Sequence, residues 1–392
     1  MDPMLHIALV DDWEVRGNGT GHPRVLQFEP IRRLMDIFER FGVRGSFNVE
    51  LLQQLTYRQH QDLDPDLRAI ADEWDATVQG AYRRGHDIEP HLHTQWSQAT
   101  YCGSLQWKLD GKWSVLEYSE DEIRSMVGTA VRYLEDLLRQ VDLGYKCVSY
   151  RAGAWCAAPS DSLFPILAEY GFELDQSMVA GICLDTPHVQ LDYTGCEEDF
   201  LPYYPVMTDA RRISSKPEPI ICIPTHTFRL NPRAMLARDL NGAWRKVRSR
   251  LARKAEQSSG DRGGTTTEWT NWSHAGLKGK LRKLAFRYVK SHLQISDLSR
   301  FDFKSMRMML ADIRSRAKET GLATVPVILE NHSKDILDFS DIERFVSLIA
   351  KAEDIRVLTL SEIARGLKKG RYAVLTQRRE SAHHPVNEAV AR

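Results

Sequence analysis

Two histidines with one residue between them are the most direct sign of chemistry in this sequence. The stretch GHDIEPHLHTQW, residues 85–96, contains His91 and His93. Because side chains alternate along a β-strand, residues two apart lie on one face and both imidazoles can reach one ion. Imidazole with carboxylate suits Zn²⁺ and similar divalent metals, and a catalytic site keeps one position open for water. The spacing predicts a metal site; the alternative is a pair of ordinary polar histidines.

Carboxylates follow the first apolar stretch of the chain. Residues 5–10 are predicted to form a buried strand, and Asp11 and Asp12 come directly after it. Adjacent strand residues point to opposite faces, so the two carboxylates can have different tasks. Further polar side chains stand where predicted strands end, and barrel enzymes build their sites at the carboxyl ends of strands. These side chains are His91, His93, Arg151, Asp175, His226 and His332.

Strands and helices are predicted to alternate along most of the chain. Such alternation is typical of a parallel α/β fold. It leaves two architectures open, a seven-stranded barrel and an open doubly wound sheet. The predicted strands are residues 5–10, 43–50, 86–93, 147–155, 172–178, 220–228 and 325–332; the predicted helices are 30–41, 66–84, 119–141 and 162–170, followed by a helix, a strand and a helix within 340–366.

The composition argues against several classes of protein. Lys and Arg together equal Asp and Glu, 53 of each in 392 residues, so the charge balance does not indicate a nucleic-acid partner. No stretch of about 18 apolar residues is present, so no transmembrane helix is expected. The N-terminal segment lacks a basic region before its apolar stretch, and the six cysteines form no Cys-x-x-Cys pair. We therefore expect a cytoplasmic protein with reduced thiols.

Six motifs, taken in order, resemble those of the polysaccharide deacetylases of the NodB-homology type, carbohydrate esterase family 4. The resemblance is nearest to the cytosolic branch associated with surface-polysaccharide biosynthesis. The motifs are ALVDDW, FERFGVRGSFNVE, GHDIEPHLHTQW, YRAGAW, GFELDQSM and VILENHSKD, followed by IRVLTLSEIA. The resemblance implies one distorted (β/α)7 barrel of the NodB type over residues 1–370. It also implies a metal-dependent hydrolase that removes an N-acetyl or related acyl group from a sugar of a polysaccharide or glycan precursor.

The resemblance assigns a role to each strand-end residue. It implies one divalent ion, most simply zinc, at the site. It also implies a general base and a general acid on either side of the substrate. The roles it implies are Asp11 as the base, Asp12 and His91 as metal ligands, Arg151 as the residue that orients the base, His332 as the acid, and Asp175 as the carboxylate that tunes the acid.

The sequence departs from the family pattern at one ligand. The second ligand histidine usually lies four residues after the first, and that position is Gln95. His93 can replace it, because His93 shares a strand face with His91. Coordination through the Gln95 oxygen and poor or absent metal binding are the other readings. We favour His93 as the third ligand.

Three further residues are candidates for substrate binding. Trp96 and Trp155 each follow a motif closely and can wall a sugar groove, because aromatic faces suit sugar rings; packing in the core is the alternative. His226 also ends a predicted strand, and a structural role is the alternative for it.

Residues 241–295 differ from the rest of the chain. Between residues 241 and 290 there are 13 Lys and Arg against three acidic residues. We expect an insertion between barrel units, with a helix at 277–293 whose apolar and basic faces suit peripheral contact with an anionic membrane. A solvated charged loop is the alternative. Residues 371–392 are predicted to be a flexible tail, and the oligomeric state stays open.

Two other functions compete with sugar deacetylation. One is hydrolysis of another non-peptide C–N amide bond on the same fold. The other is a catalytically degenerate glycan-binding protein, for which Gln95 would be the mark. A binding module has no need for a base, an acid and a metal together, so the residues favour an enzyme.

Overall fold

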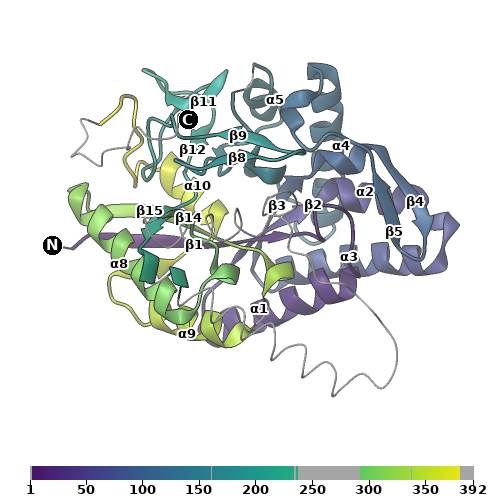
Figure 1. The fold of residues 1–392 in the computed structure, drawn as a ribbon, viewed down its shortest axis with the longest axis horizontal. Coiled ribbons are helices and arrows are strands. Elements are labelled where there is room, and N and C mark those ends of the chain that lie inside the picture. Colours follow the sequence, from purple (N-terminus) through teal and green to yellow (C-terminus); the bar gives the residue numbers. More distant parts are fainter. Residues whose placement is uncertain (1, 160, 234, 237–291, 337, 380–392) are drawn as a thin grey trace, which may run out of the picture.

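The computed structural model describes residues 2–159, 161–233, 235–236, 292–336 and 338–379. Its centre is an eight-stranded parallel sheet in the order β12–β7–β6–β3–β2–β1–β15, with β16 pairing β1 as well (Figure 1). The strands are β1 (Met4–Trp13), β2 (Ser46–Glu50), β3 (Asp87–Leu92), β6 (Ser149–Ala152), β7 (Leu174–Asp175), β12 (Ile221–Cys222), β15 (Thr324–Asn331) and β16 (Ile355–Val357).

The sheet curls until its two ends meet. Thr225, just after β12, forms a parallel bridge with Ile328 of β15, and the amide of His226 donates to the carbonyl of Ile328 at 3.0 Å. This contact joins the last strand on one side to the last strand on the other. The fold is therefore a distorted (β/α)7 barrel, as predicted, and not an open doubly wound sheet.

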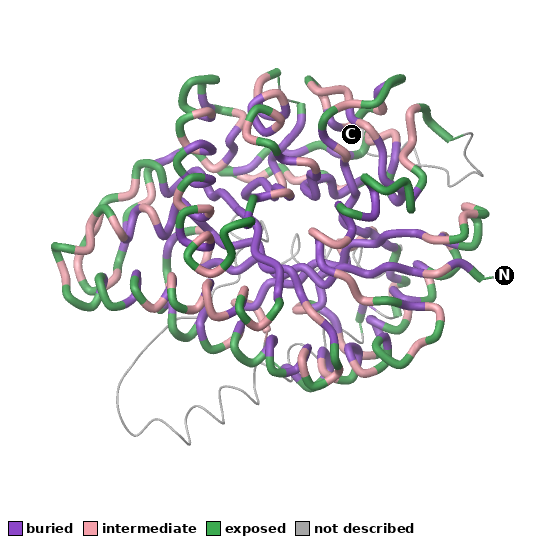
Figure 2. The backbone as a smooth tube through the Cα atoms, turned by 180° about the vertical axis from the view of Figure 1, so that it is seen from behind, coloured by how far each residue is buried: buried purple, intermediate pink, exposed green. Residues whose placement is uncertain are grey.

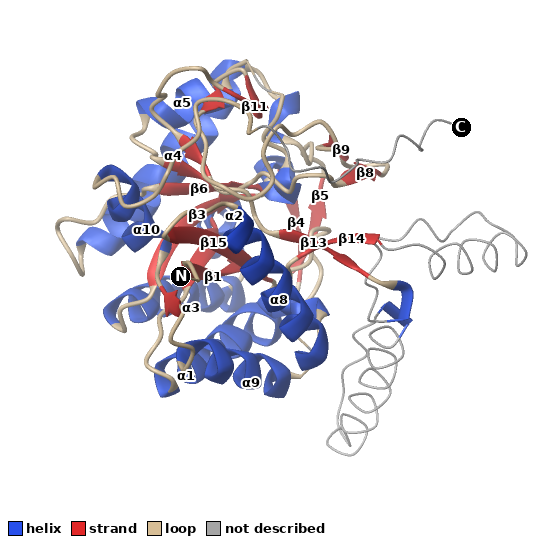
Figure 3. Ribbon diagram, turned by 90° about the vertical axis from the view of Figure 1, so that its left-hand side faces the viewer, coloured by secondary structure: helices blue, strands red, loops and turns tan. Residues whose placement is uncertain are grey.

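Helices surround the strands (Figure 3). Most begin where the sequence supplies a cap: Ser119 and Glu122, for example, form a capping box at the start of α4, whereas α1 and α5 begin without a side-chain cap. The helices are α1 (Glu29–Arg40), α2 (Leu51–His60), α3 (Pro65–Arg83), α4 (Glu120–Arg139), α5 (Leu163–Glu169), α8 (Phe303–Glu319), α9 (Phe339–Ala350) and α10 (Leu360–Lys368).

Alternation along β1 divides the core in two. Leu5, Ile7 and Leu9 belong to the large cluster that packs against the outer helices. Ala8 and Val10 belong to a smaller cluster, which also contains the buried apolar residues of α10. Buried residues accordingly concentrate on the central strands (Figure 2). This packing buries both faces of β1, the strand that carries Asp11 and Asp12 near its end.

Four two-stranded ribbons, which the sequence analysis did not predict separately, extend from the barrel. They lie between the barrel elements as antiparallel pairs. The pairs are β4 (Ala99–Gly103) with β5 (Gln106–Leu109), β8 (Cys183–Asp185) with β9 (Gln190–Asp192), β10 (Pro205–Val206) with β11 (Asp209–Ile213), and β13 (Thr227–Leu230) with β14 (His292–Ile295).

Two expectations about the C-terminal half need correction. The beginning of the predicted tail is ordered, because Tyr372 is buried and its hydroxyl lies 2.6 Å from Nδ1 of His6, while Leu375 bridges to Tyr203. Residues 292 and 293, predicted to end a basic helix, belong to strand β14, which pairs with β13. Most of the predicted insertion, residues 237–291, lies outside the described residues. In the described part of the chain, no helix has the length and apolar character needed to cross a membrane.

Candidate active site

Polar side chains converge at the carboxyl ends of β1, β3 and β15. Two sets of possible ligand atoms lie there, each within 4.8 Å of one another, and every member is buried. His332 Nε2 connects the sets, because it lies 3.8 Å from Asp12 Oδ2 and 3.9 Å from Glu14 Oε1. One set is Glu14, Glu50, His91 and His93, and the other is Asp12, Glu330 and His332.

Asp11 has the environment of a general base. Its register partner across β1 and β15 is Asn331, whose side-chain amide donates to Asp11 Oδ1. Its other oxygen, Oδ2, is buried and has no hydrogen-bond partner among the described residues. Burial raises the pKa of Asp11 to about 7, although the hydrogen bond from Asn331 opposes the shift. Such a carboxylate can accept a proton near neutral pH.

His332 has the environment of a general acid, but its partner is not the one predicted. Its Nδ1 atom lies 3.0 Å from Oδ2 of Asp297, which follows β14. Burial alone would lower the pKa of His332, yet the carboxylates of Asp297 and Glu330 raise it to about 10. The ring is therefore held as a cation at neutral pH, with Nε2 directed towards Asp12 and Glu14.

The prediction that Asp175 tunes His332 is wrong. Both Asp175 oxygens accept hydrogen bonds from Ser177, Oδ1 from the backbone N–H at 2.9 Å and Oδ2 from the hydroxyl at 2.8 Å. Burial raises the pKa of Asp175 to about 6. Asp175 therefore stabilises the turn after β7, and Asp297 occupies the position beside the histidine.

The prediction that Arg151 orients the base also needs correction. Its Nη1 donates to Glu330 Oε2 at 2.6 Å and its Nη2 to Gln176 Oε1 at 3.2 Å. Burial raises the pKa of Glu330, and a carboxylate that is fully buried needs a paired cation. Arg151 is that cation, and no bond from it to Asp11 is present in the described residues.

Asp12 is held mainly by Asn48 and by nearby cationic side chains. Its Oδ1 accepts from the Asn48 amide at 2.7 Å and lies 3.9 Å from Nε of Arg151. Burial opposes its charge, but Arg151, His91 and His332 keep the pKa of Asp12 below its ordinary value. Asp12 is therefore a stable anion, and it does not belong to the set that contains His93.

Glu14, which the sequence analysis did not single out, is the carboxylate that faces both predicted histidine ligands. Its Oε2 contacts Nε2 of His93 and lies 3.5 Å from Nε2 of His91. Its Oε1 contacts the ammonium of Lys334. Burial would raise the pKa of Glu14, but His93 and Lys334 hold it well below the ordinary value. Two imidazoles and carboxylate oxygens at this separation fit a divalent ion.

Gln95 lies behind His93. Its Nε2 lies 2.9 Å from Nδ1 of His93 and donates to the carbonyl of Gly17 at 3.1 Å, while its Oε1 has no partner among the described residues. The amide therefore contacts the far side of the His93 ring and not the side that faces Glu14. The His93 ring, and not the Gln95 amide, therefore lies beside Glu14.

Glu50 anchors the backbone around the histidines. Its Oε1 accepts from the amides of Leu52 and Gln53 at the start of α2, and its Oε2 accepts from the amide of His93 at 2.8 Å. An N-cap carboxylate of this kind satisfies helix amides that have no partner within the helix. Burial raises the pKa of Glu50. The side chain thereby ties β2, α2 and the end of β3 together.

Trp155 lies beside Glu330 and His332, and its contact with a substrate stays a prediction. Its indole N–H donates to Glu330 Oε2 at 2.9 Å, and its ring lies edge-on to His332 with centroids 6.0 Å apart. Ala154 and Trp155 both have left-handed backbones, with φ of +52° and +59°. Non-glycine residues adopt this region at a cost of about 1–3 kcal/mol, and such positions cluster at functional sites.

The other two substrate-binding candidates are structural. Trp96 is 2% exposed and its ring packs against Tyr57 and Trp107, so it belongs to the core. His226 is 1% exposed, with Nδ1 2.6 Å from the Ser296 hydroxyl and Nε2 3.2 Å from Asp312. Neither side chain is free to wall a sugar groove.

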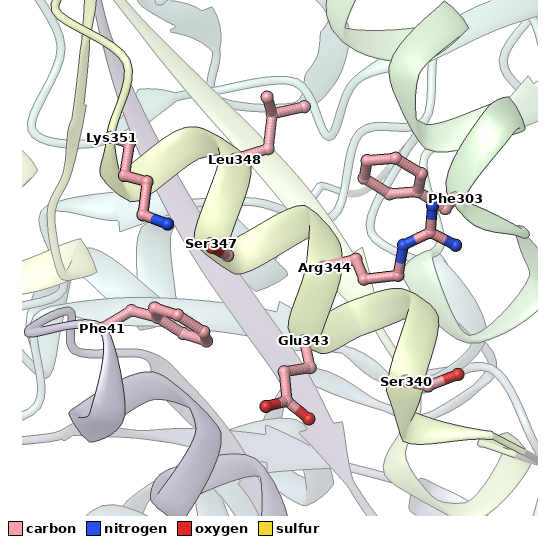
Figure 4. Close-up of a pocket in the computed structure, with 8 residues that line it drawn as sticks. All are labelled: Phe41, Phe303, Ser340, Glu343, Arg344, Ser347, Leu348 and Lys351. Atoms are coloured by element: carbon pink, nitrogen blue, oxygen red, sulfur yellow. The ribbon is translucent and has the colours of Figure 1, made fainter.

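A separate hollow on the surface has none of this chemistry. It lies along α9, between the end of α1 and the start of α8 (Figure 4). Arg344 lies over the Phe303 ring, and Glu343 pairs with Arg40. Its lining residues contain no histidine and a single carboxylate; they are Phe41, Phe303, Ser340, Glu343, Arg344, Ser347, Leu348 and Lys351.

Comparisons with known proteins bear on the fold. No protein-family model and no curated protein matches the chain. A structure from Mycobacterium smegmatis, assigned as a polysaccharide deacetylase, covers 97% of this chain and 96% of its own with 15% identity and a TM-score of 0.50. One from Pseudomonas aeruginosa PAO1 with a similar assignment covers 93% and 91% with 12% identity and a TM-score of 0.45. PuuE allantoinase covers 94% and 92% with 12% identity and a TM-score of 0.45.

At this level of identity a structural likeness concerns the fold and not the reaction. The likeness to the mycobacterial structure extends over nearly the whole of both chains. The protein therefore has the NodB-type fold of the polysaccharide deacetylases.

Proposed function

We propose that the protein is a metal-dependent hydrolase that removes an N-acetyl or related acyl group from a sugar of a polysaccharide or glycan precursor. One observation carries the proposal. Asp11 is a buried carboxylate whose Oδ2 has no hydrogen-bond partner among the described residues, and the pKa of His332 is raised so that its ring is a cation. Asp11 pairs with Asn331 across β1 and β15, and His332 directly follows Asn331, so the two groups lie at the same end of neighbouring strands. A base and an acid on neighbouring strands are what the hydrolysis of an amide requires.

Each group has a task in that reaction. A divalent ion, for which we propose zinc, supplies Lewis-acid polarisation of the acyl oxygen when it is bound. His91 and His93 are proposed to hold it. Asp11 takes the proton of the attacking water on Oδ2, the oxygen that has no hydrogen-bond partner among the described residues. His332 donates a proton from Nε2 to the leaving amine, and Asp297 on Nδ1 keeps the ring charged until then.

Residues around these groups keep them in place. Arg151 and the Trp155 indole both bind Glu330 Oε2, which positions that carboxylate beside His332. Trp155 is the partly exposed aromatic residue at the site, and we propose that its face contacts the sugar ring. The cytoplasm is the compartment that we propose.

The test is acetate release from a panel of N-acetylated sugars and oligosaccharides, with wild type beside Asp11→Asn. We expect release with wild type and a large loss with the variant. Small linear and cyclic amides serve as the second panel, and turnover of these alone would replace the proposed substrate class. Saturable glycan binding without turnover on either panel would make the protein a binding module.

A further inference from the structure

We propose that Glu14, and not Asp12, is the carboxylate ligand of the divalent ion, together with His91 and His93. The inference deepens the proposed function and rests on it only for the presence of an ion. Glu14 has no role in the motifs considered above, and its assignment comes from where its side chain lies. Its two oxygens face four nitrogen atoms, those of His91, His93, His332 and Lys334.

Glu14 Oε2 is the oxygen that both histidines face. The Nε2 atoms of both histidines are directed at this single oxygen, and the distance from His91 is 3.5 Å. Two ligand atoms of one tetrahedral zinc ion, each at about 2.0–2.1 Å from the metal, are separated by roughly 3.4 Å. The spacing of His91 and Glu14 matches two corners of such a site, whereas His93 lies closer to Oε2 and has to move away from it to admit the ion.

The surroundings of these ligands are those of a metal centre. His91 donates its Nδ1–H to the carbonyl of Arg151 at 3.0 Å, so Nε2, the atom that faces Glu14, is the nitrogen that can bind the ion once it has lost its proton. Metal-binding histidines nearly always have such a partner on the second nitrogen, and metal-binding carboxylates are themselves hydrogen-bonded. Lys334 on Glu14 Oε1 provides the latter contact and leaves Oε2 for the ion.

The competing carboxylates have other partners. Asp12 is bound by Asn48 and lies beside Arg151 and His332, and its ligand atom is outside the set of Glu14, His91 and His93. Glu50 is within that set, but its oxygens accept three backbone N–H groups. A carboxylate used in this way is a structural anchor. Glu14 is the member of the set whose Oε2 contacts only imidazole nitrogens among the described residues.

Gln95 then acts as a positioning residue for His93. For Nε2 of His93 to offer a lone pair, Nδ1 must carry the proton and needs an acceptor. Gln95 places its amide at that nitrogen, 2.9 Å away, with Oε1 unpartnered in the described residues. Rotation of the amide would place Oε1 against Nδ1–H, at the expense of the bond to Gly17. A carboxylate at position 95 would provide the acceptor permanently.

The experiment measures metal and not turnover. Wild type, Glu14→Gln and Asp12→Asn are purified without chelator, their zinc content is determined, and Co²⁺ is titrated into the metal-free proteins while its visible absorption is recorded. We expect about one ion per chain in wild type and in Asp12→Asn. The affinity of Glu14→Gln for the metal should be lower by roughly tenfold to hundredfold. Gln95→Glu is expected to bind more tightly than wild type by a similar factor.

Several outcomes would overturn the assignment. Loss of the ion in Asp12→Asn with retention in Glu14→Gln would make Asp12 the ligand, and no ion in wild type after addition of Zn²⁺ or Co²⁺ would remove the site. Circular dichroism and thermal unfolding show whether each variant is folded. If Glu14→Gln does not fold, Glu14→Asp is the second variant, because it keeps the charge but shortens the side chain. Its affinity for the metal is expected to fall at least tenfold. Metal binding as expected, with no acetate release from any sugar, would contradict the proposed function and leave this inference standing.

Discussion

The Nδ1 atom of His332 lies 3.0 Å from Oδ2 of Asp297, a residue 35 positions earlier in the chain that also pairs with Arg300. Asp297 and Glu330 form a parallel β-bridge, which brings the segment after β14 against β15. The environment of His332, the proposed acid, therefore depends on the bridge that brings Asp297 against β15.

The pairing predicts the effect of removing Asp297. Asp297→Asn should move the pKa of His332 from about 10 towards its ordinary value of 6.5, because Asp297 is the largest of the carboxylates that raise it. NMR titration of the His332 ring measures this shift directly. Asp175→Asn is the matched control, and it should leave the ring unaffected. A shift with Asp175→Asn and none with Asp297→Asn would restore the pairing predicted from the sequence.

Replacement of Asp11 should separate catalysis from metal binding. Asp11→Asn keeps the shape and an oxygen for the Asn331 amide but removes the base, so kcat should fall by roughly a hundredfold to ten-thousandfold. The metal content should match that of wild type, because Asp11 lies outside both sets of possible ligands. Steady-state acetate release and metal analysis on one preparation test both statements. Turnover that survives the change would show that another group is the base.

The Trp155 indole should contribute to stability through a single hydrogen bond. Trp155→Phe keeps an aromatic ring but leaves Glu330 Oε2 with Arg151 as its remaining partner. A hydrogen bond to a charged group contributes about 1.5–3 kcal/mol, so the free energy of unfolding should fall by about that amount. Urea unfolding measures it. An unchanged free energy of unfolding would mean that solvent replaces the indole N–H at Glu330.

Trp96 should affect stability and not substrate affinity. Trp96→Ala removes a ring that is 2% exposed and packed against Tyr57 and Trp107, and such truncations cost about 3–5 kcal/mol. The KM of the folded fraction for an acetylated sugar should stay as in wild type. A raised KM with little loss of stability would instead support the groove role that the sequence suggested.

His86 should make the fold sensitive to acid. Burial lowers the pKa of His86 from 6.5 to about 4, although Glu39 opposes the shift. The unfolded chain therefore binds a proton below about pH 6.5 that the folded protein does not, and the stabilisation present above that pH is lost as the pH falls towards 4. The loss amounts to about 3 kcal/mol for this one side chain. The free energy of unfolding of His86→Gln should therefore decrease less between pH 6.5 and pH 4 than that of wild type, by that amount, as measured by urea unfolding. The same decrease in the variant and in wild type would contradict the prediction.

Much of the fold was predictable because its signals are local. Apolar segments, helical periodicity and caps lie within single stretches of sequence, and the seven predicted principal strands correspond to strands of the structure. Closure of the barrel was not predictable from alternation, because it depends on the contact of Thr225 with Ile328 across about a hundred residues. Helix α2 was missed because it begins directly after β2, where Glu50 is the last strand residue and also the cap.

The site was predictable where residue type and strand end coincide. Asp11, Asp12, His91, His93 and His332 do come together. Glu14 and Glu330 were missed although a signal existed. Glu14 lies two residues after Asp12 and Glu330 two residues before His332, and residues two apart in an extended chain share a face.

Asp297 offered no comparable signal. It lies just beyond the basic stretch, and the pairing of residues 296 and 297 with β15 brings it to the site. The partner of Arg151 was also not predictable. A guanidinium at a strand end can bind any carboxylate on a neighbouring strand, and the sequence does not show which of these carboxylates is fully buried.

The register of the barrel strands fixes the positions of the site residues, whereas the length of the connections between strands can change. Glu50 pairs with His91 and His91 with Arg151 on successive strands, so their spacing is set by the interstrand distance of about 4.8 Å. Leu230 still pairs with His292, although residues 231–291 lie between them in sequence. Homologues should therefore differ freely in the length of such connections, whereas the deletion of one residue within β3 would turn His91 and His93 to the opposite face. Sequence divergence in this fold is therefore expected mainly in the length of the loops, while the paired strand residues keep the spacing of the candidate site residues.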